Sequence, residues 1–311
     1  MFNLGCTSDK IWNLQELLVY LSSNQHKQIV IRSSPEAICL ESLGLYQILD
    51  NFNFKQVDIQ TYNPFETSVK YNIVLQDSRW FASQQSIDPE LHAWNQKKIF
   101  FCFYHRPTAG RLGIASKMLA HYQEDTHIHF SAQVEPDNLA QFEFDKLLSY
   151  DIASIVNAGK LVNQLPMLLG SPDKYTHCNG YYYDDPLTNL YKDILIDLVV
   201  ESHVAGKTFF PTEKTIRPMW LKKPFIVFAS KDYLCYLRQM GFMTFNNCWD
   251  EEYDSYEGKE RYVRIFKLID SIAKKSKSEL NDMYWSLKYV LDHNYNLLRT
   301  QTYQKKVNKI D

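Results

Sequence analysis

Apolar and polar positions along the first part of the chain alternate between helical and strand-like spacing. Apolar residues at 11–22 recur as in an amphipathic helix, and Pro35 is placed to open a second helix that runs to Phe52. Strand-like runs occupy 27–34, 56–62 and 71–77. The pattern predicts a small α/β domain over residues 1–96, whose polar segment 82–96 connects it to the next domain.

The following part of the chain repeats the alternation on a larger scale. A buried strand at 99–104 precedes a loop and a helix at 112–122, and a strand at 194–200 precedes a helix at 213–222. Further elements are expected as strands at 128–134, 224–229 and 242–245, and as a helix at 231–240 that Gly241 ends. Strands that alternate with helices indicate a doubly wound, mostly parallel sheet, which makes 97–258 a second α/β domain.

The last segment, 259–311, is expected to be helical. Apolar positions have helical spacing over 259–300, and Ser278 is placed as the N-cap of the final helix. We expect these C-terminal helices to pack back across both domains.

Composition narrows the class of protein. Apolar residues make up 45% of the 311 residues and the formal net charge is −2, so there is a sizeable core and no basic stripe typical of nucleic-acid binding. The first ten residues lack the pattern of a secretory leader, and no run approaches the roughly 20 apolar residues of a spanning helix. The six cysteines form no CxxC, and the nine histidines have no metal-ligand spacing. We therefore predict a soluble, cytoplasmic protein with no membrane span, no metal and no bound cofactor.

Two clusters of polar side chains lie at the carboxyl ends of predicted strands, where open α/β sheets bind their ligands. The first follows strand 99–104 and consists of His105, Arg106 and Arg111. The second begins with Glu201 after strand 194–200 and continues at the next helix start with Thr212, Glu213 and Lys214.

The residue types in these clusters favour a nucleoside diphosphate over a bare anion. A helix N-terminus with a lysine and nearby arginines suits phosphate groups. Glu213 would repel phosphate, but a carboxylate can accept hydrogen bonds from the vicinal hydroxyls of a ribose. The structural alternative is ordinary helix-start chemistry, with Thr212 as N-cap, Glu213 in the first turn, and Lys214 and Arg217 solvated.

Several stretches resemble the nucleotide-sugar-binding half of α-1,3-fucosyltransferase-like glycosyltransferases. They are LVVES at 198–202, FFPTEKTIRPMWLKKPFIVFAS at 209–230 and the arginine-bearing loop FYHRPTAGR at 103–111. The stretch LRQMGFMTFNNCWDEEYD at 237–254 is similar to bacterial and viral relatives of unassigned specificity. The resemblance covers about residues 97–260 and implies two Rossmann-like domains in the GT-B arrangement, with a nucleotide-diphosphate sugar as the donor substrate.

The resemblance also implies roles for individual residues. Glu213 would hold the donor ribose and Lys214 its diphosphate, next to Thr212, while Arg106 or Arg111 would neutralise the leaving phosphate. Phe210 occupies the aromatic position of the motif, where the family usually has tyrosine. Glu201 occupies the acidic position on the preceding strand. Here the strand reads Glu-Ser rather than Glu-Asn, which leaves the identity of the donor open.

The expected chemistry is a metal-independent glycosyl transfer, since no strict Asp-x-Asp pair is present. An inverting enzyme needs a carboxylate that deprotonates the acceptor hydroxyl. Asp77, at the end of strand 71–77, is the first candidate for this base, and Glu36 and Glu66 are weaker ones; a turn or capping role for Asp77 is the structural alternative. Glu201 is the second residue assigned to catalysis.

The predicted function is therefore a glycosyltransferase that moves a sugar from a nucleotide-diphosphate donor to a hydroxyl of a glycan or other acceptor. One alternative is a non-catalytic module that binds nucleotide sugars or glycans. Another is a glycosyltransferase acting on modified DNA bases, for which the net charge of −2 argues against a large phosphate footprint but leaves a local patch open.

Overall fold

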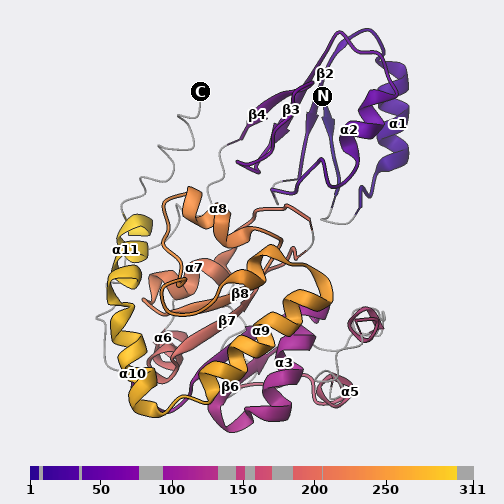
Figure 1. Cartoon of the computed structure of the whole chain (residues 1–311). Coiled ribbons are helices and arrows are strands. Elements are labelled where there is room, and N and C mark those ends of the chain that lie inside the picture. The colour runs from indigo at the N-terminus through magenta and orange to yellow at the C-terminus, as the bar shows by residue number, and fades with distance from the viewer. Residues whose placement is uncertain are drawn as a thin grey trace.

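The computed structural model contains two separate parallel sheets, one in each half of the chain (Figure 1). It describes residues 1–6, 10–34, 37–76, 94–131, 145–150, 158–169, 185–204 and 206–299. Every pairing between the strands of the two sheets is parallel. The prediction of an α/β protein with two Rossmann-like domains is confirmed at this level.

The first sheet has its strands in chain order, β1-β2-β3-β4. The strands are β1 (Phe2–Asn3), β2 (Gln28–Arg32), β3 (Gln56–Thr61) and β4 (Asn72–Leu75). The helices of this half are α1 (Leu14–Ser23) and α2 (Leu45–Asp50). Alternation in β2 and β3 places Ile29, Ile31, Val57 and Ile59 in a small core.

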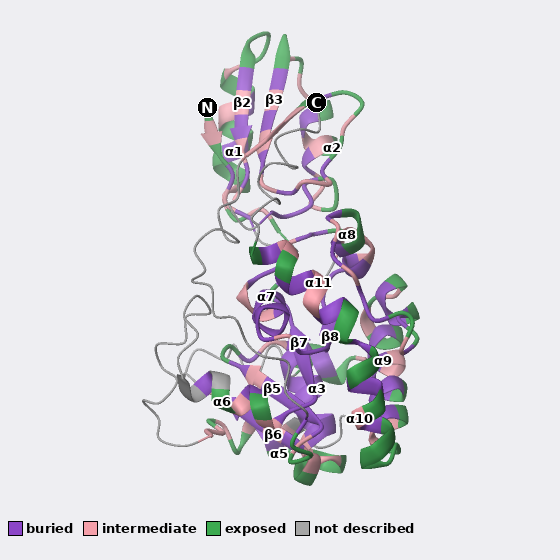
Figure 2. Ribbon diagram, turned by 90° about the vertical axis from the view of Figure 1, so that its left-hand side faces the viewer, coloured by how far each residue is buried: buried purple, intermediate pink, exposed green. Residues whose placement is uncertain are grey.

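The second sheet has the order β6-β5-β7-β8, which reverses between β5 and β7. Its strands are β5 (Phe100–Tyr104), β6 (Thr126–Phe130), β7 (Ile196–Val200) and β8 (Phe225–Phe228). The elements between and before them are α3 (Ala109–His121), the 3-10 turn η2 (Gln123–Asp125), α5 (Ala158–Val162), α6 (Asp185–Asp193) and α7 (Glu213–Trp220). All residues of β7 and β8 are buried, as continuous apolar runs in a parallel sheet should be (Figure 2).

The chain then continues through short helices into the C-terminal helices. These elements are α8 (Tyr233–Gln239), η5 (Glu252–Ser255), α9 (Gly258–Ala273), α10 (Lys277–Ser286) and α11 (Lys288–Arg299). In Figures 1 and 2, α9, α10 and α11 lie beside the second sheet and away from the first. Helices α9, α10 and α11 therefore cover the second domain. The prediction that the C-terminal helices pack across both domains is not met by these three helices.

Several local predictions are corrected by long-range contacts. The helix expected from Pro35 to Phe52 is reduced to α2, because the backbone N–H groups of Leu40 and Glu41 donate to the Glu66 carboxylate instead of to a helical carbonyl, at 2.9 and 3.3 Å. The segment 242–245 is not a strand. Its two phenylalanines, Phe242 and Phe245, are buried in the core as a loop.

Helix starts also differ from prediction. The N-cap of α10 is Ser276, whose capping box with Glu279 replaces the expected cap at Ser278. Helix α3 begins at Ala109 rather than 112, so Arg111 lies in its first turn and not in the preceding loop. Thr212 is the N-cap of α7, as the structural alternative has it, and Gly241 follows α8 at φ +92°, as predicted.

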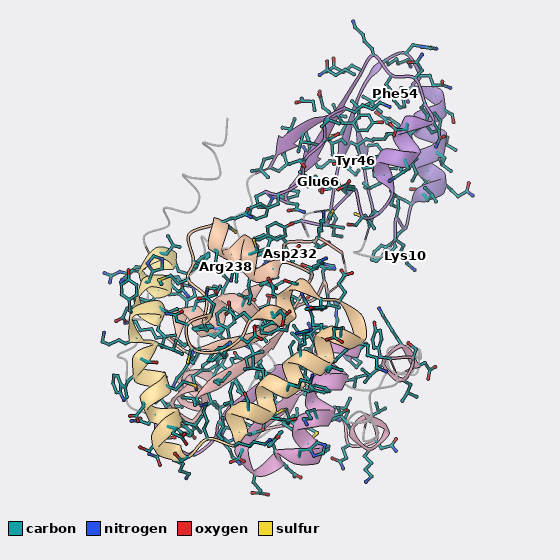
Figure 3. The ribbon with its side chains drawn as sticks, in the orientation of Figure 1. Lys10, Tyr46, Phe54, Glu66, Asp232 and Arg238 are labelled. Carbon is teal, nitrogen blue, oxygen red and sulfur yellow. The ribbon has the colours of Figure 1, made fainter. Side chains whose placement is uncertain are left out.

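Loops at the carboxyl ends of the two sheets meet between the domains. The Phe65 ring, from the loop after β3, stacks on Tyr236 with ring centroids 4.4 Å apart and meets Phe209 edge-on at 5.2 Å. The Cys39 N–H donates to the Thr208 hydroxyl at 3.2 Å. Figure 3 shows Glu66 and Tyr46 at the end of the first domain that faces Asp232 of the second. The loop 206–210, which leads into α7, is thus in contact with both domains.

Candidate functional site

The reversal of strand order between β5 and β7 identifies the carboxyl edge of the second sheet where a ligand would bind. In open α/β sheets, the loops after two such strands diverge to opposite faces and leave a crevice at the switch point. Here these loops carry His105 and Arg106 after β5, and Glu201 after β7. The fold therefore brings the two predicted clusters to the same place.

Arg111 is buried at the start of α3. Its exposed fraction is 3%, its Nη1 donates to the Arg106 carbonyl at 3.0 Å, and its Nε has no hydrogen-bond partner in the described part of the chain. Burial lowers the pKa of Arg111, and the charges of Glu201 and Glu213 act in the opposite direction. The Arg111 guanidinium is thus buried at this edge with one N–H donor that no described residue uses, and an anion could accept from that donor.

Close packing of α3 against the sheet explains how Arg111 reaches this position. A Cβ atom on Gly110 would lie 2.9 Å from Cγ1 of Val200 and 3.3 Å from the Phe228 ring. Only glycine allows the first turn of α3 to approach β7 and β8 this closely. Thr108 caps the helix by accepting from the Arg111 N–H.

Glu201 lies at the end of β7 with an exposed fraction of 1%. Its carboxylate accepts from the Thr212 N–H at 3.0 Å, from the hydroxyls of Thr212 and Thr215 at 2.5 Å each, and from the Tyr233 hydroxyl at 3.2 Å. Both oxygens are occupied by donors of the protein. This geometry favours a residue that fixes the N-terminus of α7 over one that contacts reacting atoms, and the catalytic role predicted for Glu201 has no support from it.

Glu213 and Lys214 form the exposed face of the same helix start. The Lys214 ammonium donates to the Glu213 carboxylate and, at 3.1 Å, to the Thr212 hydroxyl. Burial by itself raises the pKa of Glu213, but the adjacent Lys214 outweighs burial and holds that pKa below its ordinary value. Both side chains are partly exposed, at 24% for Glu213 and 15% for Lys214, so a ligand can reach them.

The two clusters act on each other electrostatically. The positive charges of Arg106, Arg111 and Lys214 lower the pKa of His105. The negative charges of Glu201 and Glu213 act to raise the pKa of Arg111. Arg106 is exposed, and no described residue pairs with its guanidinium. Three cations from the β5–α3 loop, α3 and α7 therefore converge at one edge of the sheet, with Glu213 beside them.

Two other residues of the stretch 209–230, Arg217 and Phe210, do not join the charged cluster. Arg217 is 3% exposed, donates through Nε to the Tyr191 hydroxyl at 2.6 Å and lies 3.6 Å from the Asp197 carboxylate. The solvated Arg217 of the structural alternative is therefore wrong, because the guanidinium is buried and bound to core residues, where a ligand cannot reach it. Phe210 is half-buried with its ring 6.1 Å from that of His203, at the approach to α7.

The predicted acceptor-side residues are placed only in part. Asp77 and Glu36 lie outside the described residues. Glu66 is 7% exposed and accepts from the Tyr46 hydroxyl in addition to the backbone of Leu40 and Glu41. Burial raises the pKa of Glu66 above its ordinary value despite these hydrogen bonds. Both oxygens of Glu66 are occupied by protein donors, as those of Glu201 are, so its role as a base rests only on its position at the end of the first domain facing the second (Figure 3).

Within the described ranges, no cluster of histidine, cysteine, aspartate and glutamate has the composition of a metal site. Among the same residues, every helix is too short or too polar to cross a bilayer. The predicted independence of metal stays a prediction.

No family model and no curated protein matches this chain. One solved structure that is similar in part is the C-terminal domain of a glycosyl transferase group 1 family protein (LpcC) from Francisella tularensis. It is 15% identical, the match covers 68% of this chain and 94% of that one, and the TM-score is 0.34. A likeness this low carries no weight for function, and the resemblance to fucosyltransferase-like enzymes gains no support from these comparisons.

Proposed function

We propose that this protein is a glycosyltransferase that uses a nucleoside-diphosphate sugar as donor and a hydroxyl group as acceptor. The observation that carries the proposal is the convergence of Arg106, Arg111 and Lys214 at the switch point of the second sheet, beside the N-terminus of α7. A diphosphate has the charge and size to neutralise such a group of cations.

The start of α7 presents a carboxylate and an ammonium group side by side. Glu201 holds the N-cap Thr212 by two hydrogen bonds, and the Thr212 hydroxyl in turn accepts from the N–H and the ammonium of Lys214. The Lys214 ammonium at the start of α7 therefore has a fixed direction. Glu213 is already ionised by its contact with Lys214, and a ligand hydroxyl pair could replace that contact on the carboxylate. This geometry supports an arrangement in which the ribose hydroxyls bind to Glu213 and the phosphates bind to Lys214.

The site would accelerate transfer by stabilising the departing diphosphate. Negative charge develops on the bridging oxygen as the glycosidic bond breaks, and preorganised cations lower the energy of that state without reorganisation. Arg106 has the exposure to contact the leaving phosphate, and the buried Arg111 donates to the Arg106 backbone carbonyl. The proposed mechanism needs no metal ion. Asp77 or Glu66 of the first domain is the proposed base toward the acceptor.

Donor binding is tested first by thermal unfolding with UDP, GDP, ADP, CMP and dTDP in the presence of EDTA. Ligand at about 100-fold over its dissociation constant stabilises the folded state by roughly 2.7 kcal/mol. We expect one nucleotide to stabilise the wild type and to lose most of this effect in Lys214→Ala. The control is Lys267→Ala, which removes an exposed lysine on α9. Equal stabilisation of Lys214→Ala and wild type, or no stabilisation by any nucleotide, would refute the proposed site.

A non-catalytic module that binds nucleotide sugars is the second candidate, because both oxygens of Glu201 are already occupied by protein donors. The two candidates differ in turnover. An enzyme slowly hydrolyses the bound nucleotide sugar even without its acceptor, and Asp77→Asn or Glu66→Gln should stop this release while donor affinity is retained. A module binds the same nucleotide and never releases the sugar.

A further inference from the structure

His105 is close enough to Arg106, Arg111 and Lys214 for their charges to act on it, and it has no role in the function proposed above. Its side chain is exposed, and its Nδ1 lies 2.9 Å from the Ser131 hydroxyl. The register of the sheet explains the contact between His105 and Ser131. Tyr104 pairs with Phe130, so the residues that follow them, His105 and Ser131, lie side by side.

The surroundings of Ser131 determine the direction of that hydrogen bond. The Ser131 N–H donates to the Tyr104 carbonyl at 3.0 Å, and its hydroxyl lies 3.4 Å from the same oxygen. A hydroxyl proton directed at Tyr104 leaves the Ser131 oxygen as acceptor for the proton on Nδ1 of His105. Nε2 of His105 is then the unprotonated nitrogen, and no described residue bonds to it.

The groups that face His105 come from each neighbouring element. Arg106 is adjacent in the same loop, Arg111 comes from α3 and Lys214 from α7, while His129 on β6 is a titratable neighbour. Partial desolvation of the imidazole, followed by the charges of Arg106, Arg111 and Lys214, holds the pKa of His105 below its ordinary value, although the residue remains largely exposed. Burial lowers the pKa of His129 to about 4. Without a ligand, His105 is therefore neutral at neutral pH.

We propose that His105 is a proton-linked ligand of the donor diphosphate: it binds a proton at Nε2 when the phosphates arrive and donates it in a hydrogen bond to a phosphate oxygen. The inference rests on the proposed function. A diphosphate neutralises the three cations whose repulsion disfavours the imidazolium, and its own charge stabilises that imidazolium. One proton moves from solvent to Nε2, and no covalent bond to the ligand forms.

The proton makes donor affinity depend on pH. Because the pKa of His105 is higher with ligand than without it, binding takes up a fraction of one proton between the two pKa values. Affinity for the diphosphate should then rise as the pH falls from about 8 to about 6, the range in which a histidine titrates. A histidine with only a structural role would produce no such uptake.

The test is calorimetric titration of the full chain with the nucleoside diphosphate, from UDP, GDP, ADP or dTDP, that stabilises it most. Titrations in buffers of different ionisation enthalpy give the number of protons taken up, for wild type and for His105→Gln. Glutamine keeps a neutral polar group in the region of Nε2 but cannot be protonated. The terminal phosphate of the ligand also titrates near neutral pH, and this contribution is common to both proteins and cancels in their difference.

We expect the wild type to take up about half a proton more than His105→Gln near pH 7, and the affinity of His105→Gln to be lower by up to about tenfold at pH 6 and close to wild type at pH 8. His121→Gln, an exposed histidine at the end of α3, is the matched control and should behave as wild type. Equal proton uptake in wild type and His105→Gln overturns the role of His105 while leaving the nucleotide site in place. Absence of binding by all four diphosphates overturns both proposals.

Discussion

The two halves of this protein use the same parallel four-stranded design but differ in strand order. The first sheet runs β1-β2-β3-β4 without reversal, whereas the second, β6-β5-β7-β8, reverses between β5 and β7. Only a reversal sends consecutive loops to opposite faces and opens the sheet edge. The charged cluster of Arg106, Arg111 and Lys214 is found at that reversal.

The two halves also differ in what they bury. The first core is small and its polar edge consists mainly of neutral groups, with Glu66 as its buried acid. The second core extends over α3, α7 and the C-terminal helices and encloses ion pairs such as Arg217–Asp197. The charged side chains of the second domain therefore lie on an extensively packed core, as the proposed binding of a charged ligand would require, whereas the first domain has a smaller core.

The largest expected effect is at the buried ion pair of the second domain. Asp197→Ala removes the carboxylate that compensates Arg217 and accepts from the Tyr191 hydroxyl. Since this leaves a buried guanidinium without its counter-charge, we expect the free energy of unfolding to fall by about 3–5 kcal/mol. Urea denaturation followed by circular dichroism measures it.

Two further variants separate charge from packing at this position. The double variant Asp197→Leu with Arg217→Met removes both charges and should recover much of the loss. Lys97→Ala breaks an exposed pair with Asp193 and should cost at most about 1 kcal/mol. If Asp197→Ala were as mild as Lys97→Ala, the buried ion pair would contribute no more to the second core than an exposed pair does.

Tight packing of α3 should give the next largest effect. A Cβ on Gly113 would lie 2.6 Å from the Tyr262 ring and 3.0 Å from Leu147, both in the core. We expect Gly113→Ala to lower the unfolding free energy by up to about 3 kcal/mol, because overpacking forces the buried ring to shift. Gly5→Ala in the first domain, where the nearest atoms are at 3.4 Å, should change it by about 0.5 kcal/mol or less. A thermal unfolding series would contradict this if both variants were equally stable.

The sequence pattern predicted most strands of both sheets because their apolar runs are long and bounded by polar turns. It also predicted Thr212 as a cap, which depends on residues close in sequence. It could not reveal that the Glu66 carboxylate accepts hydrogen bonds from the backbone of Leu40 and Glu41, since Glu66 is more than twenty residues from both in the sequence. The burial of Arg217 and the pairing of His105 with Ser131 likewise follow from sheet register and strand order, which local patterns do not encode.

The contact between the domains gives a smaller effect. Phe65→Ala removes ring contacts with Phe209 and Tyr236, worth together about 1–2 kcal/mol. Since the loop 206–210 is held by these contacts, we expect its backbone amides to exchange with deuterium roughly tenfold faster in Phe65→Ala. Phe54→Ala, at the far end of the first domain in Figure 3, should leave that loop unchanged. An unaltered exchange rate in Phe65→Ala would show that the domains are not coupled through this ring.

The smallest effect concerns the acid of the first domain. Burial raises the pKa of Glu66 above its ordinary value of 4.5, so the folded state binds this proton more tightly than the unfolded chain. Its stabilising contribution is fully present below pH 4.5 and is lost as the pH rises through the folded pKa. The unfolding free energy of wild type relative to Glu66→Gln should therefore fall by on the order of 1 kcal/mol over that interval and be flat on either side. Glu16→Gln removes an exposed carboxyl on α1 and is the control for net charge. A constant difference between wild type and Glu66→Gln at every pH would mean that Glu66 is ionised as easily as a solvent-exposed acid, and the first domain would then offer no tuned base to the donor site across from it.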